Sequence, residues 1–333
     1  MKVLVTGATG FLGKNLVSKL CETGYECRCV TRSKNNIDSF IGNYKIDWFY
    51  ADMNDPSTLE GIEDGIDAVF HLAGVMGHIG AFSAKERDWK LFKTVNVEGT
   101  RNIANRFISR PLKRFIYISS TAAMGIIPDI VVDENTPMRP KTPYQCSKAE
   151  AEQLLKEYYH SYGLPVIILR PCVFYGNGMV GDLRKLALFA KRGVLPHIGR
   201  EKNLSPLIHV NELVNACIAS LKKGRSGEIY IIASSRSYSM RELAASVKKS
   251  MNARPFEFTI PVFAAYMIAF FCECLYKFLG IKPLITIENI KGVVANRMFS
   301  IKKAEKELGF RQETGLDQCV EDSIRWLREN HFI

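Results

Sequence analysis

The sequence lacks the cysteine patterns that mark disulfide-bonded and zinc-binding proteins. Its 333 residues include nine cysteines, an odd number, and these are scattered without a CxxC pair or a neighbouring histidine cluster. Disulfide frameworks and structural zinc sites both need regular cysteine spacing. We therefore expect reduced thiols, no bound metal and a cytoplasmic location.

Nucleic-acid-binding motifs, internal repeats, low-complexity tracts and an N-terminal targeting signal are also missing from the sequence. The net charge of +11 would suit nucleic acid or an anionic membrane surface, but lysines and arginines are spread along the whole chain. We expect no nucleic-acid partner. An apolar fraction of 47% and a charged fraction of 24% are ordinary for a globular protein of one large or two moderate domains.

A glycine-rich loop near the N-terminus is the most informative feature that is present. The apolar run at residues 2–5 predicts a buried strand, and Gly7, Gly10 and Gly13 follow it at three-residue spacing. In such a loop, one glycine permits a tight turn, one lets backbone N–H groups approach a pyrophosphate, and one lets the next helix pack closely on the strand. The helix N-terminus adds partial positive charge. The loop therefore predicts dinucleotide binding.

Strand-like and helix-like segments alternate through the first half of the chain. This alternation predicts right-handed βαβ units and a doubly wound parallel α/β sheet, the Rossmann arrangement. The predicted strands are 2–5, 26–31, 46–50, 68–72, 114–119 and 166–169, and the predicted helices are 11–23, 88–109 and 144–162.

The pattern loosens after Arg170-Pro171, where glycine and proline punctuate residues 175–206. A helix at 210–221 and a strand at 228–233 follow this segment. We expect a dinucleotide-binding domain at 1–172, with a returning segment near 207–233, and a smaller mixed α/β substrate domain at 173–333.

The end of the second predicted strand bears on the identity of the cofactor. Folds that take NAD usually place a carboxylate there, which accepts hydrogen bonds from the ribose hydroxyls. This chain has Thr31 in that position, followed by Arg32 and Lys34. A guanidinium would hold a 2′-phosphate that a carboxylate would repel. The alternative is that Arg32 is a solvated loop charge. We favour NADP, with NAD as the second choice.

A tyrosine and a lysine downstream supply a candidate proton donor. Tyr144 and Lys148 stand at i, i+4 spacing and share one helix face, after a strand that ends in Ser119-Ser120. A neighbouring ammonium favours phenolate and brings the tyrosine pKa toward the working range, while a serine hydroxyl holds the substrate oxygen. With 13 tyrosines, about one such pair is expected by chance. Its position after a strand ending in serines favours a hydride-transfer enzyme.

Taken together, these motifs resemble the extended short-chain dehydrogenases/reductases of the NAD-dependent epimerase/dehydratase family. The resemblance covers nearly the whole chain and rests on the order of segments 7–13, 52–53, 71–74, Asn96, 119–120, 144–148 and 170–171. It implies that Tyr144 is the general acid/base and that Lys148 binds the nicotinamide ribose. It also implies that Ser120, with Ser119 as the competing assignment, orients the substrate oxygen, and that Asn96 supports the active site.

The resemblance also implies a set of cofactor contacts and a homodimer. The predicted contacts are Gly7, Thr9, Gly10, Phe11, Leu12, Gly13, Arg32, Asp52, Met53, Leu72, Ala73, Gly74, Tyr144 and Lys148. Two of the motif residues have structural alternatives, since Asp52 could cap a turn before Pro56 and Asn96 could tie a helix to the sheet. We expect His71 to be a packed residue at a strand end.

Within the family, the chain is most similar to the dihydroflavonol reductase and 3β-hydroxysteroid dehydrogenase branches. The family's dehydratases carry an Asp-Glu pair after the active-site hydroxyl residue, and this chain has Thr121-Ala122 there. Thr31-Arg32 and the segment 204–207 both depart from the sugar-nucleotide enzymes. We expect hydride transfer between nicotinamide C4 and an alcohol or ketone carbon of an apolar substrate that is sterol-, isoprenoid- or flavonol-like. The alternatives are a sugar-nucleotide epimerase or reductase, and a non-catalytic dinucleotide-binding regulator.

Residues 260–272 are almost uninterruptedly apolar, and Glu273 and Lys277 follow directly. The run is short for a membrane span. It fits a core helix of the substrate domain, the wall of a pocket for a lipid-like substrate, or a peripheral membrane contact through residues 260–281. Lys277, Lys282 and Lys291 would suit anionic headgroups.

Overall fold

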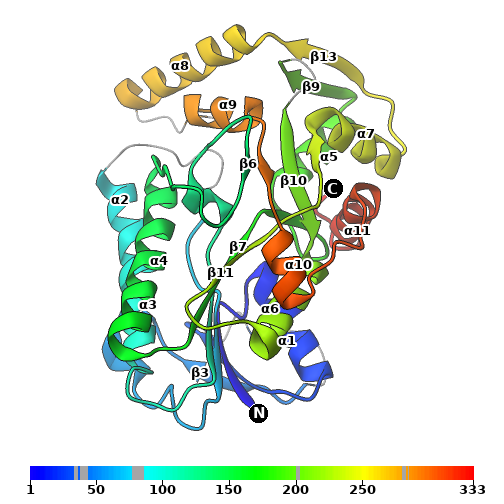
Figure 1. Cartoon of the computed structure of the whole chain (residues 1–333). Coiled ribbons are helices and arrows are strands. Elements are labelled where there is room, and N and C mark those ends of the chain that lie inside the picture. The colour runs from blue at the N-terminus through cyan, green and yellow to red at the C-terminus, as the bar shows by residue number, and fades with distance from the viewer. Residues whose placement is uncertain (34–36, 38–43, 77–85, 200–202, 280–282, 284) are drawn as a thin grey trace.

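A seven-stranded parallel sheet, in the order β11-β7-β5-β4-β1-β2-β3, forms the centre of the protein (Figure 1). The computed structural model describes residues 1–33, 37, 44–76, 86–199, 203–279, 283 and 285–333. The strands of this sheet are β1 (Lys2–Thr6), β2 (Glu26–Thr31), β3 (Asp47–Tyr50), β4 (Ala68–His71), β5 (Arg114–Ile118), β7 (Val166–Pro171) and β11 (Ile229–Ile232). The predicted doubly wound sheet is confirmed, and β11, from the returning segment, is its edge strand.

Helices cover both faces of the sheet. On one face lie α1 (Phe11–Glu22) and α6 (Val210–Lys223), and on the other lie α2 (Glu86–Phe92), α3 (Gly99–Asn105) and α4 (Pro143–Tyr162). Strand β1 shows why its sequence is a continuous apolar run. Val3 and Val5 pack toward α1 and α6 while Leu4 packs toward the opposite face, and all of these side chains are fully buried.

The C-terminal half builds smaller sheets. A mixed sheet of β8 (Val173–Tyr175), β10 (Leu204–His209) and β12 (Ser237–Ser239) shares a core with the helices α5 (Asp182–Lys191), α7 (Met240–Met251) and α11 (Leu316–Glu329). Two further strand pairs are parallel, namely β9 (Val194–Ile198) with β13 (Phe256–Ile260) and β6 (Val131–Val132) with β14 (Met298–Phe299). The remaining helices are α8 (Val262–Leu279), α9 (Ile287–Val294) and α10 (Lys302–Leu308).

Two predicted segments differ from the structure. In place of the single helix expected at 88–109, the structure has α2, a π-helical segment Lys93–Glu98 that contains Asn96, and α3, which ends at Asn105. The glycine- and proline-punctuated segment 175–206, for which no helix or strand was predicted, contains α5 and β9. Glycine and proline residues near α5 in the sequence obscure its apolar pattern, although Leu183, Ala187 and Ala190 are all buried. The domain boundary between 172 and 173 stays a prediction.

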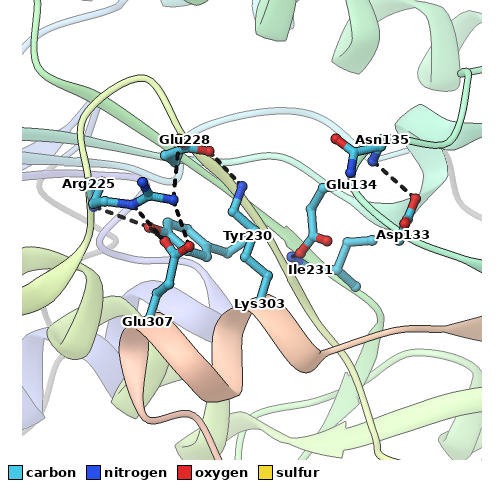
Figure 2. A network of polar contacts seen from close by, with 9 residues as sticks. All are labelled: Asp133, Glu134, Asn135, Arg225, Glu228, Tyr230, Ile231, Lys303 and Glu307. Carbon is cyan, nitrogen blue, oxygen red and sulfur yellow. Dashed lines mark hydrogen bonds and ion pairs between the residues drawn. The ribbon is translucent and has the colours of Figure 1, made fainter.

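A polar network fastens α10 to the edge strand β11 (Figure 2). Arg225, after α6, donates to Glu307 of α10, and Lys303 of α10 pairs with Glu228 at the start of β11. Tyr230 of β11 also donates to Glu307. Pairs as exposed as these contribute little individually, so their effect is to keep α10 in register with the strand.

A carboxylate protects the same edge strand. Glu134, which follows β6, accepts a hydrogen bond from the backbone N–H of Ile231 at 2.9 Å (Figure 2). An edge strand exposes unpaired N–H groups that can pair with another chain. Glu134 therefore blocks one position at which the sheet could be extended.

Helix α8 lies largely on the surface of the protein. Only Ala265 and Ala269 of its 18 residues are buried, so the core-helix interpretation of residues 260–272 is wrong. By length and composition α8 is the one helix of the described residues that could cross a membrane, with a mean hydropathy of 1.7. Residues 280 and 281 of the predicted membrane contact, and Lys282, lie outside the described residues.

The glycine loop provides a test of the fold. A methyl group at Gly13 would lie against the carbonyl oxygen of Gly7 and 2.6 Å from that of Ala8, whereas no atom of the described residues lies within 4 Å of a methyl group at Gly292 in α9. We expect Gly13→Ala to lower the free energy of unfolding by about 1–3 kcal/mol through overpacking. Gly292→Ala should be neutral or stabilise by up to about 1 kcal/mol. Urea unfolding measures both, and equal stability of the two variants would contradict the packing described here.

Candidate active site

The glycine loop lies where the strand order reverses, between the carboxyl ends of β1 and β4. Gly7 has φ +69°, and a methyl group there would stand 2.8 Å from the backbone nitrogen of Ala73 in the loop after β4. Ligands of doubly wound sheets bind in the crevice at this switch point. The two loops therefore form the floor of the site.

The N-terminus of α1 fits an anionic ligand. Gly10 is the N-cap, and because glycine has no side chain, the helix has no side-chain cap. The first turn of α1 contains no acidic residue. Its leading N–H groups, which include those of Phe11 and Leu12, have no partner within the helix and carry its partial positive charge. These residues fit the pyrophosphate of a dinucleotide, which a capping carboxylate would exclude.

The side chains of the loop are anchored on the protein. Phe11 stacks on Phe174 at a centroid distance of 5.4 Å, and Leu12 is buried in the core under α1. Thr9 precedes both in the loop and is partly buried. The predicted loop contacts thus lie together at the end of β1 and the start of α1.

The predicted contacts beyond β2 and β3 lie at the far side of this crevice. Thr31 is buried in a turn with Ser33, Arg32 is exposed, and Lys34 lies outside the described residues. Asp52 accepts a hydrogen bond from Asn54 N–H at 2.9 Å through Oδ1, so the structure supports its turn-capping alternative.

Met53 has its side chain in the core. It is 9% exposed and packs against Gly99 of α3. Its carbonyl accepts a hydrogen bond from Asn102 at 2.9 Å.

The loop after β4 connects the phosphate end of the crevice with the catalytic end. Leu72 and Ala73 donate their N–H groups to Thr6, to its carbonyl and its hydroxyl respectively. A methyl group at Gly74 would stand 2.9 Å from Asn96 Oδ1 and 3.5 Å from Lys148 Nζ. Gly74 therefore keeps open the path between the two ends.

His71 is a packed residue, as expected. Its Nδ1 lies 2.7 Å from Thr6 Oγ1 and its Nε2 lies 3.0 Å from Thr100 Oγ1. Burial, with the nearby Lys148 ammonium, lowers the pKa of His71 to about 3. The neutral ring links β4 to β1 and α3.

Asn96 joins three parts of the site. Its amide exchanges hydrogen bonds with the backbone of Val75, at 2.8 and 3.1 Å, and donates to Ser147 Oγ of α4 at 2.9 Å. It lies within the π-helical segment, a local widening that is frequent at functional sites. The structure thus supports the tying role that was the alternative for Asn96.

Tyr144 and Ser120 meet at the carboxyl edge of the sheet. A capping box of Thr142 and Gln145 begins α4, which places Tyr144 in its first turn. Ser120, two residues after β5, caps a short 3₁₀ helix by accepting a hydrogen bond from Ala122 N–H, and its hydroxyl lies close enough to Tyr144 to act on the phenol. Burial raises the pKa of Tyr144, and the Ser120 hydroxyl opposes this shift.

Lys148 lies one turn further along α4. Its ammonium donates to Tyr117 Oη at 3.2 Å and to the Ile118 carbonyl at 2.9 Å. Burial lowers the pKa of Lys148 to about 8, although Glu152 raises it. We expected Lys148 to lower the pKa of Tyr144. In the structure the ammonium instead bonds Tyr117 and Ile118 of β5, and the pKa of Tyr144 is raised.

A buried ion pair beside these residues was not found from the sequence. Glu152, one further turn along α4, accepts two hydrogen bonds from Arg170 Nη2 and Nε, at 2.6 and 3.0 Å, and a third from Ser119 Oγ. Ser119 is engaged there, whereas Ser120 faces Tyr144. The available signal was the continued i, i+4 spacing from Tyr144 and Lys148 to Glu152, with Arg170 at a strand end.

The site is that of an enzyme that uses a dinucleotide. A model of the NAD dependent epimerase/dehydratase family matches residues 3–233. The chain belongs to this NAD-dependent family, and it is an enzyme of the extended short-chain dehydrogenase/reductase type.

Relatives in the family differ in the reaction that their names describe. A putative dihydroflavonol 4-reductase of Synechocystis sp. is 25% identical, over 99% of this chain and 95% of that protein. A 3-beta-hydroxysteroid dehydrogenase of Mycolicibacterium neoaurum is 26% identical, over 96% and 90%. The UDP-glucuronic acid 4-epimerase of Bacillus cereus, solved in complex with NAD, is 20% identical with a TM-score of 0.80, over 99% of this chain and 100% of that one, and shows the shared fold.

The buried ion pair gives a test of the site's architecture. We expect Glu152→Gln to destabilise the protein by about 3–5 kcal/mol, because Arg170 would keep a buried charge without its partner. Glu150→Gln, an exposed change on the same helix, is the matched control and should alter stability by less than about 0.5 kcal/mol. Thermal and urea unfolding measure both variants, and a Glu152→Gln variant as stable as the control would contradict the role of this pair.

Proposed function

We propose that the enzyme transfers a hydride between nicotinamide C4 and an alcohol or ketone carbon of an apolar substrate, with Tyr144 as general acid/base. The observation that carries the proposal is the proximity of the Ser120 hydroxyl to Tyr144 at the start of α4, with Lys148 one helical turn further along the same helix. A hydroxyl pair of this kind can hold one substrate oxygen and exchange a proton with it.

Each residue of the site has a proposed part in this reaction. The bound dinucleotide supplies or accepts the hydride. Ser120 orients the substrate oxygen, and Tyr144 gives its proton to that oxygen in reduction and takes it back in oxidation. Lys148, which faces Gly74 across the crevice, holds the nicotinamide ribose, and Asn96 positions the loop beside it.

An apolar substrate is supported by the two relatives named as a dihydroflavonol reductase and a hydroxysteroid dehydrogenase. Thr121-Ala122, at the start of the 3₁₀ helix, offers no acid and base for the elimination of water. The alternative function, a sugar-nucleotide epimerase or reductase, is supported by the likeness to the UDP-glucuronic acid 4-epimerase.

We further propose NADP as the preferred cofactor. No carboxylate occupies the end of β2, and the exposed Arg32 side chain there is available to a 2′-phosphate. The proposed enzyme is a cytoplasmic homodimer with a peripheral membrane contact through residues 260–281, of which 262–279 form the exposed helix α8.

The proton-transfer role is tested by removing a single hydroxyl. Tyr144→Phe should lower kcat about 10²–10⁴-fold for ketone reduction, because the general acid is lost, and leave the Kd for NADPH within about twofold. Tyr162→Phe, on the exposed end of α4, is the matched control. Assays with sterol-like and flavonol-like ketones and with UDP-sugars measure turnover and stereochemistry.

Two results of these assays would contradict the proposal. Retained ketone turnover by Tyr144→Phe would remove the general acid from that residue. Epimerisation of a UDP-sugar by the native enzyme, without net cofactor consumption, would establish the alternative.

The cofactor proposal is tested at Arg32. A charge-assisted contact with a phosphate contributes about 1.5–3 kcal/mol, so Arg32→Ala should weaken NADPH binding about 10–100-fold and leave NADH binding unchanged. Arg311→Ala, an exposed arginine after α10, is the control. Fluorescence titration of both cofactors measures the change, and a native preference for NADH that survives Arg32→Ala would refute NADP.

A further inference from the structure

Exposed apolar side chains run along β13 and α8. We call this surface the apolar ridge, and its members are Phe256, Phe258, Phe263, Met267, Ile268, Phe270, Phe271, Leu275, Phe278 and Leu279. Phe263 and Phe278 are 76% and 79% exposed. Exposed apolar side chains gathered in this way mark an interaction surface, whereas isolated ones do not.

The inner face of α8 explains which side chains point outward. Ala265 and Ala269, one turn apart, pack on Ile290 of α9. One turn later Glu273 accepts a hydrogen bond from Ile287 N–H at 2.8 Å. This narrow face of small and polar residues holds α8 on the protein and leaves the aromatic residues on the other faces.

Strand β13 projects two phenylalanines outward, because successive side chains of a strand point to opposite faces. Glu257 bonds His197 of β9 at 2.8 Å and pairs with Lys248 of α7, so its side of the strand makes the polar contacts with neighbouring elements. Phe256 and Phe258 therefore project from the opposite side, where their rings stack 6.2 Å apart. Figure 1 shows β13 and α8 one after the other along the upper edge of the molecule, far from the N-terminus and β3.

The topology keeps both ends of α8 on one side. Before it, β13 pairs with β9, and after it α9 packs back on α8. Further along the chain, β14 pairs with β6 and α11 packs on α7. A spanning α8 would carry α9, β14, α10 and α11 across the bilayer and break these contacts. The helix can enter a membrane only by lying in its plane.

Basic residues mark both ends of the ridge. Lys191, Arg192 and Arg254 are exposed just before β9 and β13, which start at the same edge, and Lys277 is exposed near the end of α8. The acidic residues Glu257 and Glu273 are both engaged, Glu257 in an ion pair with Lys248 and Glu273 in a hydrogen bond from Ile287 N–H. This distribution, in a chain of net charge +11, complements anionic headgroups.

We infer that the apolar ridge binds the surface of an anionic phospholipid bilayer, with α8 parallel to the membrane plane and its aromatic residues at the level of the acyl boundary. The inference deepens and rests on the membrane contact proposed above, but it does not depend on the hydride-transfer chemistry. It names the kind of membrane, the orientation of the helix and the added part of β13.

Vesicle sedimentation with the full chain tests the surface. The native protein should bind phosphatidylcholine vesicles that contain phosphatidylglycerol, and bind pure phosphatidylcholine several-fold less. Phe263→Glu with Phe278→Glu should lower the bound fraction at least tenfold, and Arg254→Glu with Lys277→Glu should abolish the preference for phosphatidylglycerol. Tyr162→Glu, which changes an exposed aromatic residue on α4, is the control and should bind as the native protein does.

Tryptophan probes test the orientation. Phe263→Trp, Phe271→Trp and Phe278→Trp should all be quenched alike by lipids brominated near the headgroup, because α8 lies in the plane. A spanning helix would place Phe271 near the bilayer centre, where lipids brominated at depth quench best. That outcome would overturn the in-plane orientation.

Three results would overturn the surface itself. The first is that the native chain does not bind vesicles. The second is that vesicle binding survives the change at Phe263 and Phe278. The third is that the native chain is a dimer which binds no vesicles and which the same change converts to a monomer. NADPH titration of the variants without vesicles should match the native protein. Loss of vesicle binding with unchanged cofactor binding separates this inference from the proposed chemistry, which the Tyr144→Phe assay decides.

Discussion

Glu152 has no exposed surface, and a charge in that position is tolerated only when opposite charge and hydrogen bonds replace the lost water. Arg170, in β7, supplies the charge, and Ser119, after β5, supplies another donor. The carboxylate thereby joins α4 to two neighbouring strands. Because Ser120 follows one of these strands and Tyr144 lies on α4, the distance between the two hydroxyls depends on this buried ion pair.

The cofactor end of the crevice depends on close backbone approach. The loops after β1 and β4 meet where a methyl group at Gly7 would touch Ala73, and the second loop runs on to Gly74, Asn96 and Lys148. A side chain at either glycine would separate the phosphate end from the catalytic end. The same strand ends that build the sheet thus bring the two halves of the site together.

Much of this arrangement follows from local patterns in the chain. The strand positions agree within one or two residues, and the glycine loop, Tyr144 and Lys148 lie where their spacing predicts, because buried parallel strands and helix faces leave short-range signals. The pairing of Glu152 with Arg170 was not predicted, although Arg170 belongs to one of the motifs, since the two residues are 18 apart in the chain and nothing local links their charges. Helix α5 was missed although its residues are good helix formers, because the glycines and prolines around it dominate that part of the sequence. The π-helical segment was missed because an amphipathic pattern predicts an α-helix and does not mark a local widening.

The sequence by itself determined the parallel sheet, the dinucleotide loop and the spacing of Tyr144 and Lys148, because each is written in neighbouring residues. Only the tertiary structure decided which serine meets Tyr144, where the Lys148 ammonium is held, and that α8 is exposed rather than buried. The sequence of an apolar helix does not show whether the helix is buried in a core or exposed on a surface. What covers it is set by segments distant in the chain, here by the return of α9 onto a narrow face of small residues.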